Sequence, residues 1–230
     1  MDTTQTPETK TTSLSSLKLA IGVFLGTLII SGIVIFAVLN TFLVDSQART
    51  IEFTENTNGV RVIDPPRAVA DFTMTAQTGA DVSLSDLQGT YTLLYFGYTH
   101  CPDVCLISLA EVIQVREGLG GDAIDDEMSF VFISVDGERD TPERMQEFFR
   151  PRNVGDFMIG MTGDAPTLQR MGVDYGLFYQ LNDDADQNGN YTVDHTANLY
   201  LIDPQGQLTT IFAYGTDVDL IIEHIQEKLG

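Results

Sequence analysis

Two cysteines, Cys101 and Cys105, are the residues best suited to chemistry in this chain. They lie between an apolar run, residues 90–98, and a stretch of helical periodicity that begins near Val104. Backbone N–H groups and the helix dipole at a helix start stabilise a thiolate, which lowers the pKa of a cysteine there. The pair therefore indicates a redox disulfide or a site for a soft metal. A static disulfide is disfavoured, because a bond across so short a loop constrains little of the unfolded chain.

The spacing of the cysteines bears on this choice. A thioredoxin-type redox pair is normally Cys-x-x-Cys, whereas Pro102, Asp103 and Val104 place three residues between the sulfurs here. In the first turn of a helix this spacing puts both sulfurs on one face, with room for an atom between them. Two thiolates suit Cu(I), and an added imidazole would let the same site hold Cu(II). The question becomes which histidine can reach the pair.

The chain has three histidines. His100 directly precedes the first cysteine, and strand alternation predicts that its side chain points away from the pair and packs nearby. His224 lies in a predicted C-terminal helix and is expected at the surface. His195 lies between the polar loop 182–192 and a predicted strand at 198–202, and such junctions are where sites assemble in α/β proteins. From the pattern alone, His195 is either a third metal ligand or an exposed loop residue.

The predicted elements alternate between strand and helix, which indicates an α/β sheet covered by helices. Strands are predicted from apolar runs and alternation at 90–98, 128–135 and 157–161, with hairpins at 72–84 and 198–214. Helices are predicted at 104–119, from the Thr141-Pro142 cap to 149, at 165–171 and at 217–229. The cysteine pair thus falls where the most apolar strand passes into a helix.

Residues 19–44 carry no charge and are long enough for a helix to cross about 30 Å of hydrocarbon. A cleaved signal peptide is the alternative, with Ser46-Gln47-Ala48 as its cleavage site, but its apolar core would be shorter, about 7–15 residues. We therefore expect a retained single-pass transmembrane anchor at 19–44. Lys10 and Lys18 precede it, which favours an N-terminus inside the cell. Residues 1–18 would then be a short cytoplasmic N-terminus.

The rest of the chain would face the outside of a bacterial cytoplasmic membrane. Residues 45–67 are polar and broken by Pro65-Pro66, so they are predicted to be a linker. Residues 68–230 are predicted to form the folded domain. The net charge of −21 excludes nucleic acid as a partner, because a phosphate backbone is bound by clustered Lys and Arg. It predicts an acidic, hydrated surface for which the sequence indicates no partner.

Three segments together resemble the Sco/SenC family, the membrane-anchored, thioredoxin-like copper proteins that serve assembly of cytochrome c oxidase. They read YFGYTHCPDVC at 95–105, ISVDGERDTPERM at 133–145 and VDHTANLYLIDPQG at 193–206. The resemblance extends from about residue 68 to the C-terminus. It implies a thioredoxin-like fold, with a central mixed sheet flanked by helices, and places the family's metal ligands on Cys101, Cys105 and His195. Leu106 and Gly137 depart from the family, since many members have proline at both positions.

The resemblance implies a copper metallochaperone. Reduced Cys101 and Cys105 would hold Cu(I), and His195 would stabilise Cu(II). Copper would pass to the dinuclear copper centre of cytochrome c oxidase subunit II, and an upstream copper donor or a thiol reductant would be a further partner. The resemblance also implies that residues 182–194 form a loop that brings the histidine to the site.

Acidic and basic residues near the predicted site are expected to have structural roles. Asp136, Arg139 and Asp140 are predicted to fix a loop beside the site by ion pairing. Asp194 is expected to be a solvated carboxylate, with orientation of His195 as its alternative role.

Two other functions stay open. A thiol–disulfide oxidoreductase would use the same pair on the cysteines of a target, with Cys101 attacking and Cys105 resolving. Thioredoxin-type enzymes place a cis-proline before the strand that faces the active site, whereas the corresponding stretch here reads His195-Thr196-Ala197. A redox or copper sensor is compatible with the same residues. We therefore expect a metallochaperone rather than an enzyme.

Overall fold

The structure is a computed structural model that describes residue 25 and residues 30–37, 53–182 and 191–230. Residues 30–37 are helical and belong to the predicted anchor, 19–44. Most of that anchor, and all of residues 1–18, lie outside the described residues. Within the described ranges, no helix combines the length and the apolar character needed to cross a membrane. The second compact unit of the chain, residues 51–230, holds the sheet and is described below.

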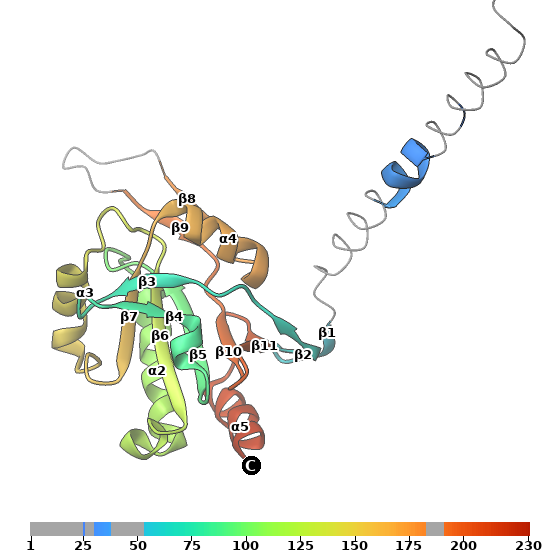
Figure 1. Ribbon diagram of the computed structural model, residues 1–230. Coiled ribbons are helices and arrows are strands. Elements are labelled where there is room, and N and C mark those ends of the chain that lie inside the picture. The colour runs from blue at the N-terminus through green and yellow to red at the C-terminus, as the bar shows by residue number, and fades with distance from the viewer. Residues whose placement is uncertain (1–24, 26–29, 38–52, 183–190) are drawn as a thin grey trace, which may run out of the picture. The chain divides into compact units, whose positions relative to one another are not determined.

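A nine-stranded mixed sheet forms the centre of this unit, in the order β1-β2-β11-β10-β5-β6-β7-β3-β4 (Figure 1). Its strands are β1 (Phe53–Thr57), β2 (Val60–Ala68), β3 (Thr73–Ala76), β4 (Asp81–Ser83), β5 (Tyr91–Gly97), β6 (Met128–Ser134), β7 (Met158–Thr162), β10 (Leu199–Ile202) and β11 (Gln207–Phe212). Strands β5, β6 and β7 are parallel, and the other pairings are antiparallel. The predicted central strands and both predicted hairpins are confirmed.

Among the described residues of the unit, four α-helices connect or follow these strands: α2 (Val104–Leu119), α3 (Pro142–Phe149), α4 (Ala165–Tyr175) and α5 (Val218–Leu229). Helix α3 begins as its sequence predicts, because the Thr141 side chain accepts a hydrogen bond from the Arg144 N–H and Pro142 occupies the first turn. Helix α2 ends at Gly120, whose positive φ of 124° favours glycine. The parallel strands β5, β6 and β7 are thus joined through α2 and α3.

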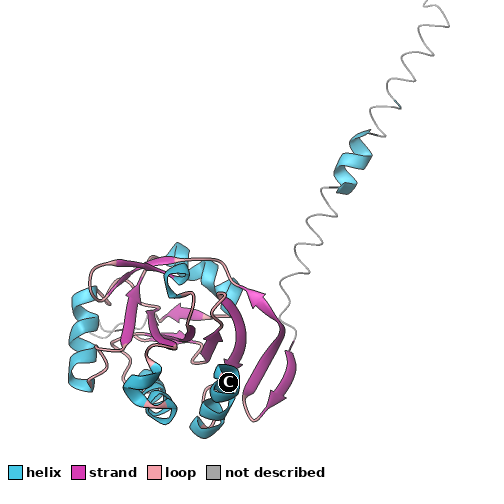
Figure 2. Ribbon diagram, turned by 60° about the horizontal axis from the view of Figure 1, so that its bottom comes forward, coloured by secondary structure: helices cyan, strands magenta, loops and turns pink. Residues whose placement is uncertain are grey.

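The helices cover the sheet on two faces (Figure 2). Tyr95, Phe132 and Gly160 are register neighbours on β5, β6 and β7, and Phe149 of α3 packs on this row. A Cβ on Gly160 would collide with Phe149, so glycine lets α3 approach the sheet closely. Helices α2 and α5 lie on the same face, and α4 covers the other, where its Tyr175 packs against the β5 ring of Phe96.

Strand β1 and all of strand β2 except Ala68 lie within the stretch 45–67 that the sequence indicated as a linker. Strand β2 pairs with β11 on both sides of an irregularity, between residues 60–62 and again at 67–68. Pro65 and Pro66 fall inside that irregularity, where the register with β11 shifts. The prolines therefore interrupt the ladder without ending the strand, and the described folded unit extends N-terminal to residue 68.

A separate two-stranded sheet lies beside the carboxyl ends of the parallel strands (Figure 1). It pairs β8 (Tyr179–Leu181) with β9 (Val193–His195) in antiparallel register, with Tyr179 opposite His195. Residues 183–190, within the predicted loop 182–194, lie outside the described residues. Before and after that segment the described chain is connected by a hydrogen bond, since the Asn182 N–H donates to the Thr192 carbonyl at 2.9 Å. This small sheet holds His195 at the same edge as the end of β5.

Candidate metal site

Cys101 and Cys105 occupy the turn between β5 and α2 and the first turn of α2. The Cys101 N–H donates to the Tyr98 carbonyl at 3.3 Å, which closes the turn after the strand. The Cys105 N–H, one of the first donors of the helix, donates to the Cys101 Sγ at 3.4 Å. Both cysteines are free thiols and both are buried. The start of α2 therefore donates a backbone hydrogen bond to the Cys101 sulfur and includes Cys105 in its first turn.

His195 approaches the pair from β9. Its Nε2 lies 3.3 Å from the Cys105 Sγ, and its Nδ1 lies 3.1 Å from the Thr196 carbonyl oxygen. A carbonyl oxygen only accepts, so Nδ1 carries a proton toward Thr196, and Nε2 is the nitrogen that faces the sulfurs. The rings of Tyr98 and Tyr95 meet the imidazole edge-on, with centroids 5.8 and 6.3 Å away. The orientation of His195 is therefore set by a backbone carbonyl and two aromatic rings.

The structure brings together all three residues that the resemblance singled out. One ligand atom from each of Cys101, Cys105 and His195 lies within 4.8 Å of the others. Two sulfurs and one imidazole form a soft donor set that suits copper, and the buried sulfurs lie behind a partly exposed histidine. The free thiols can also form a disulfide if they are oxidised. The site is therefore equipped for soft-metal binding or for thiol exchange.

The two cysteines differ in their acidity. The pKa of Cys101 is lowered, chiefly because the Cys105 thiol donates a hydrogen bond to its sulfur, with further help from His195 and backbone N–H groups. The pKa of Cys105 is raised, because its proton is held in that same hydrogen bond and because the thiol is buried. The reduced pair consequently carries its negative charge on Cys101. Thiolates are the reactive and metal-binding form, so the lowered pKa makes the Cys101 sulfur the more reactive of the two.

A cluster of Asp136, Arg139 and Tyr191 ties the chain before β9 to the end of β6. Arg139 donates through Nε to an Asp136 carboxylate oxygen at 2.6 Å and through a terminal nitrogen to the Tyr191 carbonyl at 2.9 Å. Tyr191 donates its hydroxyl to the other Asp136 oxygen at 2.7 Å. Its ring also stacks under the Arg139 guanidinium, 3.4 Å from the ring centroid. The predicted ion pair is present, but the sequence reasoning missed Tyr191.

The Asp136–Arg139–Tyr191 cluster connects to the site through Tyr98. The Tyr98 hydroxyl accepts a hydrogen bond from the Val193 N–H at 3.2 Å, and Arg139 lies over the Tyr98 ring, 5.9 Å from its centroid. Burial is the main cause that raises the pKa of Tyr98 to about 12. Hydrogen bonds at Tyr191 and at Val193 therefore hold the short segment that precedes His195.

Asp140 is a buried structural carboxylate, as predicted, although its contacts are mainly hydrogen bonds. It accepts from the Thr99 N–H at 2.8 Å, the Thr99 hydroxyl at 2.6 Å and the Ser134 hydroxyl at 2.7 Å. His100 Nδ1 lies 3.3 Å from the same carboxylate, in keeping with a packing role. His100, Asp136 and Asp140 also offer ligand atoms close together, but both carboxylates are occupied by protein donors. This second group fixes the loop beside the site.

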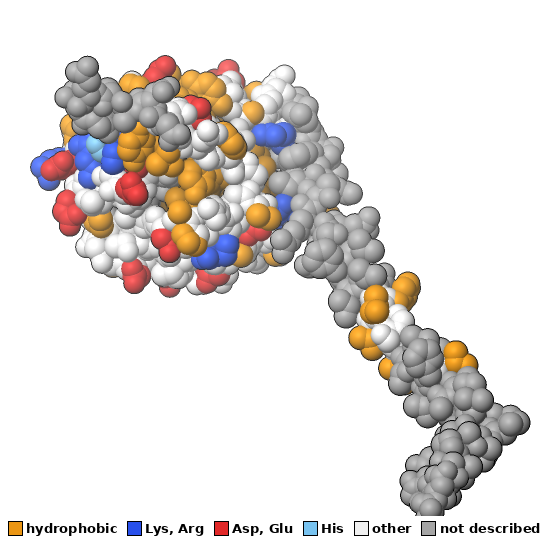
Figure 3. Space-filling model, turned by 90° about the horizontal axis from the view of Figure 1, so that it is seen from above, with side chains coloured by type: hydrophobic (Ala, Val, Ile, Leu, Met, Phe, Trp, Pro, Cys, Tyr) orange, Lys and Arg blue, Asp and Glu red, His pale blue; other side chains and the backbone are white. Residues whose placement is uncertain are grey.

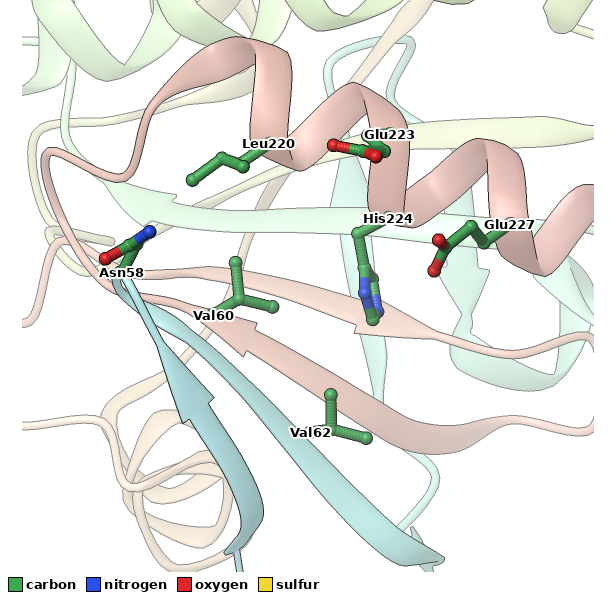
Figure 4. Close-up of a pocket in the computed structure, with 7 residues that line it drawn as sticks. All are labelled: Asn58, Val60, Val62, Leu220, Glu223, His224 and Glu227. Atoms are coloured by element: carbon green, nitrogen blue, oxygen red, sulfur yellow. The ribbon is translucent and has the colours of Figure 1, made fainter.

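The remaining candidates lie away from the sulfurs. Asp194 is exposed and accepts a hydrogen bond from the Asn182 amide at 3.2 Å, while Thr196 takes the role of orienting His195. His224 was expected at the surface but is half-buried between α5 and β11, with Nε2 2.9 Å from the Thr210 hydroxyl. It lines a hollow of about 200 Å³ together with Glu223 and Glu227 (Figure 4).

Known proteins are similar to this chain over the part that contains these residues. A family model described as SCO1/SenC matches residues 60–230. The Arabidopsis thaliana protein SCO1 homolog 1, mitochondrial, is 32% identical over 186 residues, covering 76% of this chain and 52% of that protein. The Homo sapiens protein SCO1 homolog, mitochondrial, is 34% identical over 155 residues, covering 66% and 50%. The chain thus spans about half the length of these curated relatives.

The solved structure of Bradyrhizobium japonicum ScoI with copper bound is similar to this fold, with a TM-score of 0.61. The two are 34% identical, and the match covers 70% of this chain and 98% of that one. The predicted thioredoxin-like α/β fold with a central mixed sheet is thereby confirmed. With the family model matching most of its length, the chain belongs to the SCO1/SenC family.

Proposed function

We propose that this protein is a copper metallochaperone that holds its metal with Cys101, Cys105 and His195. The observation that carries the proposal is the convergence of two buried sulfurs and one imidazole nitrogen within 4.8 Å. Support comes from the relative in Bradyrhizobium japonicum, a 34% identical ScoI whose structure was solved with copper bound. Copper is the cargo of this site, and the protein supplies the ligands and their orientation.

The ligands divide the work between two oxidation states. Two thiolates hold Cu(I) in a nearly two-coordinate site, and the imidazole nitrogen adds the borderline donor that Cu(II) requires. The Cys101 sulfur is already favoured as thiolate, so only Cys105 must lose its proton as the metal enters. Transfer to an acceptor then proceeds by exchange of these ligands for a cysteine or histidine of the target.

The surface around the site suits contact with a protein acceptor. Figure 3 looks onto the end of the unit where β8 and β9 lie, and hydrophobic side chains gather there while many acidic ones lie toward its edge. A hollow of about 300 Å³, lined among others by Asp136, Tyr179 and Leu181, adjoins the two-stranded sheet. Because Tyr179 is opposite His195, a segment of a partner seated there would lie next to the third ligand.

The target we propose, from the family resemblance, is the dinuclear copper centre of cytochrome c oxidase subunit II. An upstream copper donor or a thiol reductant would prepare the site. The apolar segment 19–44 would anchor the chain in a bacterial cytoplasmic membrane, with residues 1–18 inside and the sheet-bearing unit outside. Tethering would keep donor and acceptor on one surface and raise their effective concentration.

A second candidate function is thiol–disulfide exchange, and the lowered pKa of Cys101 favours it. The Cys101 thiolate would attack a target disulfide and form a mixed disulfide, releasing one target thiolate. Cys105, after losing its proton, would attack Cys101 and release the second target thiolate. The target would be reduced by two electrons and the pair oxidised to a disulfide, which an external thiol reductant would have to reduce again.

Ligand substitution in the full chain, purified in detergent, tests the proposal against this second candidate. We expect one copper per chain, loss of Cu(I) binding in Cys101→Ser and in Cys105→Ser, and His224→Ala as a control that binds copper like the wild type. Exchange activity predicts instead that Cys105→Ser accumulates a mixed disulfide with a target. Absence of stable copper in the wild type would refute the chaperone function, whatever the disulfide chemistry shows.

A further inference from the structure

An accessible histidine directly precedes the outer cysteine of the metal site. Cys101 is 7% exposed whereas Cys105 is completely buried, so the Cys101 sulfur is the outer one of the pair. His100 is the residue before Cys101, which places their Cα atoms about 3.8 Å apart. The His100 side chain is 33% exposed. It is not one of the three residues whose ligand atoms converge at the site, so the proposed function leaves it without a role.

One nitrogen of the His100 ring is held by two acceptors. Nδ1 lies 3.3 Å from an Asp140 carboxylate oxygen and 3.2 Å from the Thr99 hydroxyl oxygen. The Thr99 hydroxyl donates its own proton to the same Asp140 oxygen at 2.6 Å, so it can only accept from His100. A carboxylate also only accepts. Nδ1 therefore carries a proton that points to these two oxygens.

The other ring nitrogen of His100 is open. Nε2 makes no hydrogen bond with any of the described residues. Asp140 is completely buried, so the exposed part of the His100 ring is the part away from Asp140, which includes Nε2. Proteins orient metal-binding histidines in this way, with one ring N–H held by a carboxylate or carbonyl and the other nitrogen free for the metal.

The three histidines of the chain differ in this respect. At His195, Nδ1 lies 3.1 Å from the Thr196 carbonyl oxygen and Nε2 faces the sulfurs. His100 repeats this arrangement with its Nε2 toward solvent. At His224, Nε2 itself lies 2.9 Å from the Thr210 hydroxyl, so that nitrogen is occupied. His100 and His195 are thus arranged to bind a metal through Nε2, and His224 is not.

Asp103 is a second exposed residue beside the cysteines. It precedes α2 and its side chain makes no capping hydrogen bond. A carboxylate oxygen suits magnesium, calcium and manganese, whereas an imidazole nitrogen suits copper. Of the two exposed side chains, His100 therefore matches the metal that the site is proposed to carry.

We propose that His100 Nε2 is a transfer ligand, which binds copper briefly as the metal enters or leaves the site formed by Cys101, Cys105 and His195. The inference rests on the proposed function, because it concerns copper on its way to that same site. During loading, a copper–nitrogen bond to His100 forms as a bond to the copper donor breaks. A copper–sulfur bond to Cys101 then forms as the bond to His100 breaks. Copper keeps its oxidation state, and protons displaced from the sulfurs go to water.

A ligand in this place changes the rate of transfer rather than the final affinity. Copper held on His100 meets the neighbouring sulfur at an effective concentration of about 1 mM, as for other closely linked groups. Copper complexes supplied at micromolar concentration meet it far less often. The affinity of the loaded site stays the same, because His100 is not a ligand once the metal is bound.

His100→Asn tests the proposal, because the asparagine amide can still donate near Asp140 but has no atom at the place of Nε2. We supply micromolar Cu(I) as its glutathione complex to the full chain in detergent and follow the ultraviolet thiolate-to-copper absorption by stopped flow. The loading rate should fall about tenfold, while the equilibrium Cu(I) affinity stays within about twofold of the wild type.

Two matched variants serve as controls. His224→Asn makes the same substitution at a histidine whose Nε2 is occupied, and Asp103→Asn removes the exposed carboxylate beside the cysteines. Both proteins should load at the rate of the wild type. An equal slowing in His224→Asn, or a slowing in Asp103→Asn in place of His100→Asn, would overturn the proposal.

Labelling with diethyl pyrocarbonate provides a test that needs no variant at His100. In the full chain with Cys101→Ser and Cys105→Ser, mass spectrometry should find His100 labelled, because Nε2 is accessible. Added Cu(II) should protect His100 and leave the labelling of His224 unchanged. Equal labelling of His100 with and without copper would contradict a copper-binding role for Nε2.

The outcomes separate this inference from the proposed function. A wild type that binds no copper refutes the function and with it the inference. A wild type that binds copper, together with a His100→Asn protein that loads at the same rate, overturns the inference alone. A His100→Asn protein that loses equilibrium affinity as strongly as it loses rate also overturns it, because a transfer ligand does not contribute to the loaded site.

Discussion

Tyr191→Phe tests whether His195 is held in place by the chain segment that precedes it. The substitution deletes one hydroxyl, and with it the 2.7 Å hydrogen bond to the buried Asp136 carboxylate. A hydrogen bond to a charged group contributes about 1.5–3 kcal/mol. The Arg139 stack on the ring and the bond from Arg139 to the Tyr191 carbonyl remain, so the segment is loosened rather than released.

The expected effect falls on one oxidation state of copper. In the proposed site Cu(II) is bound through the His195 imidazole, so a less ordered β9 should weaken Cu(II) binding, whereas two thiolates alone can hold Cu(I). If about half of the lost hydrogen-bond energy appears in binding, Cu(II) affinity falls about tenfold, since about 1.4 kcal/mol corresponds to tenfold. Cu(I) affinity should stay within about twofold of the wild type by the same reasoning.

Competition titrations with chelators for each oxidation state measure both affinities. Tyr91→Phe is the matched control. Tyr91 is the first residue of β5, at the end of the strand away from the cysteines, and the substitution removes its 3.2 Å hydrogen bond to the Lys228 carbonyl. It should change neither affinity. Unchanged Cu(II) affinity in Tyr191→Phe, or an equal loss for Cu(I) and Cu(II), would refute the idea that the Asp136–Arg139–Tyr191 cluster positions His195.

The other predictions concern acidity and packing. Because the folded state lowers the pKa of Cys101, its thiolate persists on acidification, and iodoacetamide labelling followed by mass spectrometry should slow far less from about pH 8 to about pH 6 than in the unfolded chain. Cys105→Ala removes the donor to that sulfur and should move the loss of labelling to higher pH. Gly160→Ala should lower stability to chemical denaturation by about 1–3 kcal/mol, through collision with Phe149. Asp140→Ala should cost about 3–5 kcal/mol in the same assay, because it leaves three buried donors without an acceptor.

The stability of the reduced protein should depend on pH through both cysteines. The lowered pKa of Cys101 contributes stability at pH values above about 8.5, the pKa of the thiol in the unfolded chain. This stability is lost as the pH falls through the pKa of the folded state. The raised pKa of Cys105 contributes stability that is present below the unfolded value and is lost as the pH rises above it. Alkaline denaturation of Cys105→Ala, compared with the wild type, should show the second contribution missing.

The central strands and the caps could be predicted because their signals are local. The apolar run that forms β5 and the Thr141-Pro142 start of α3 are readable in a few consecutive residues. The pairing of β2 with β11 was not predicted. Pro65-Pro66 is a local signal for a break in a strand, whereas the strand that pairs with β2 on both sides of these prolines lies more than a hundred residues away in the sequence.

The three candidate ligand residues could be predicted from the sequence, but the contacts that orient them could not. Cysteine spacing and the family resemblance pointed to the three residues. The Thr196 carbonyl that orients His195 and the Tyr191 hydroxyl that reaches Asp136 are tertiary contacts of residue types with many other uses. An aromatic residue at the end of an acidic loop is the one signal that could have singled out Tyr191.

The copper content and the visible and EPR spectra of the full-length protein, beside those of His195→Ala, test the Cys101, Cys105 and His195 site most directly. We predict one copper per chain in either oxidation state, with a thiolate-to-Cu(II) charge-transfer band that disappears in His195→Ala while Cu(I) stays bound. An unaltered Cu(II) spectrum in His195→Ala would remove the histidine from the site. Failure of the wild type to hold copper, with a readily reversible disulfide between Cys101 and Cys105, would contradict the metallochaperone function and leave thiol exchange in its place.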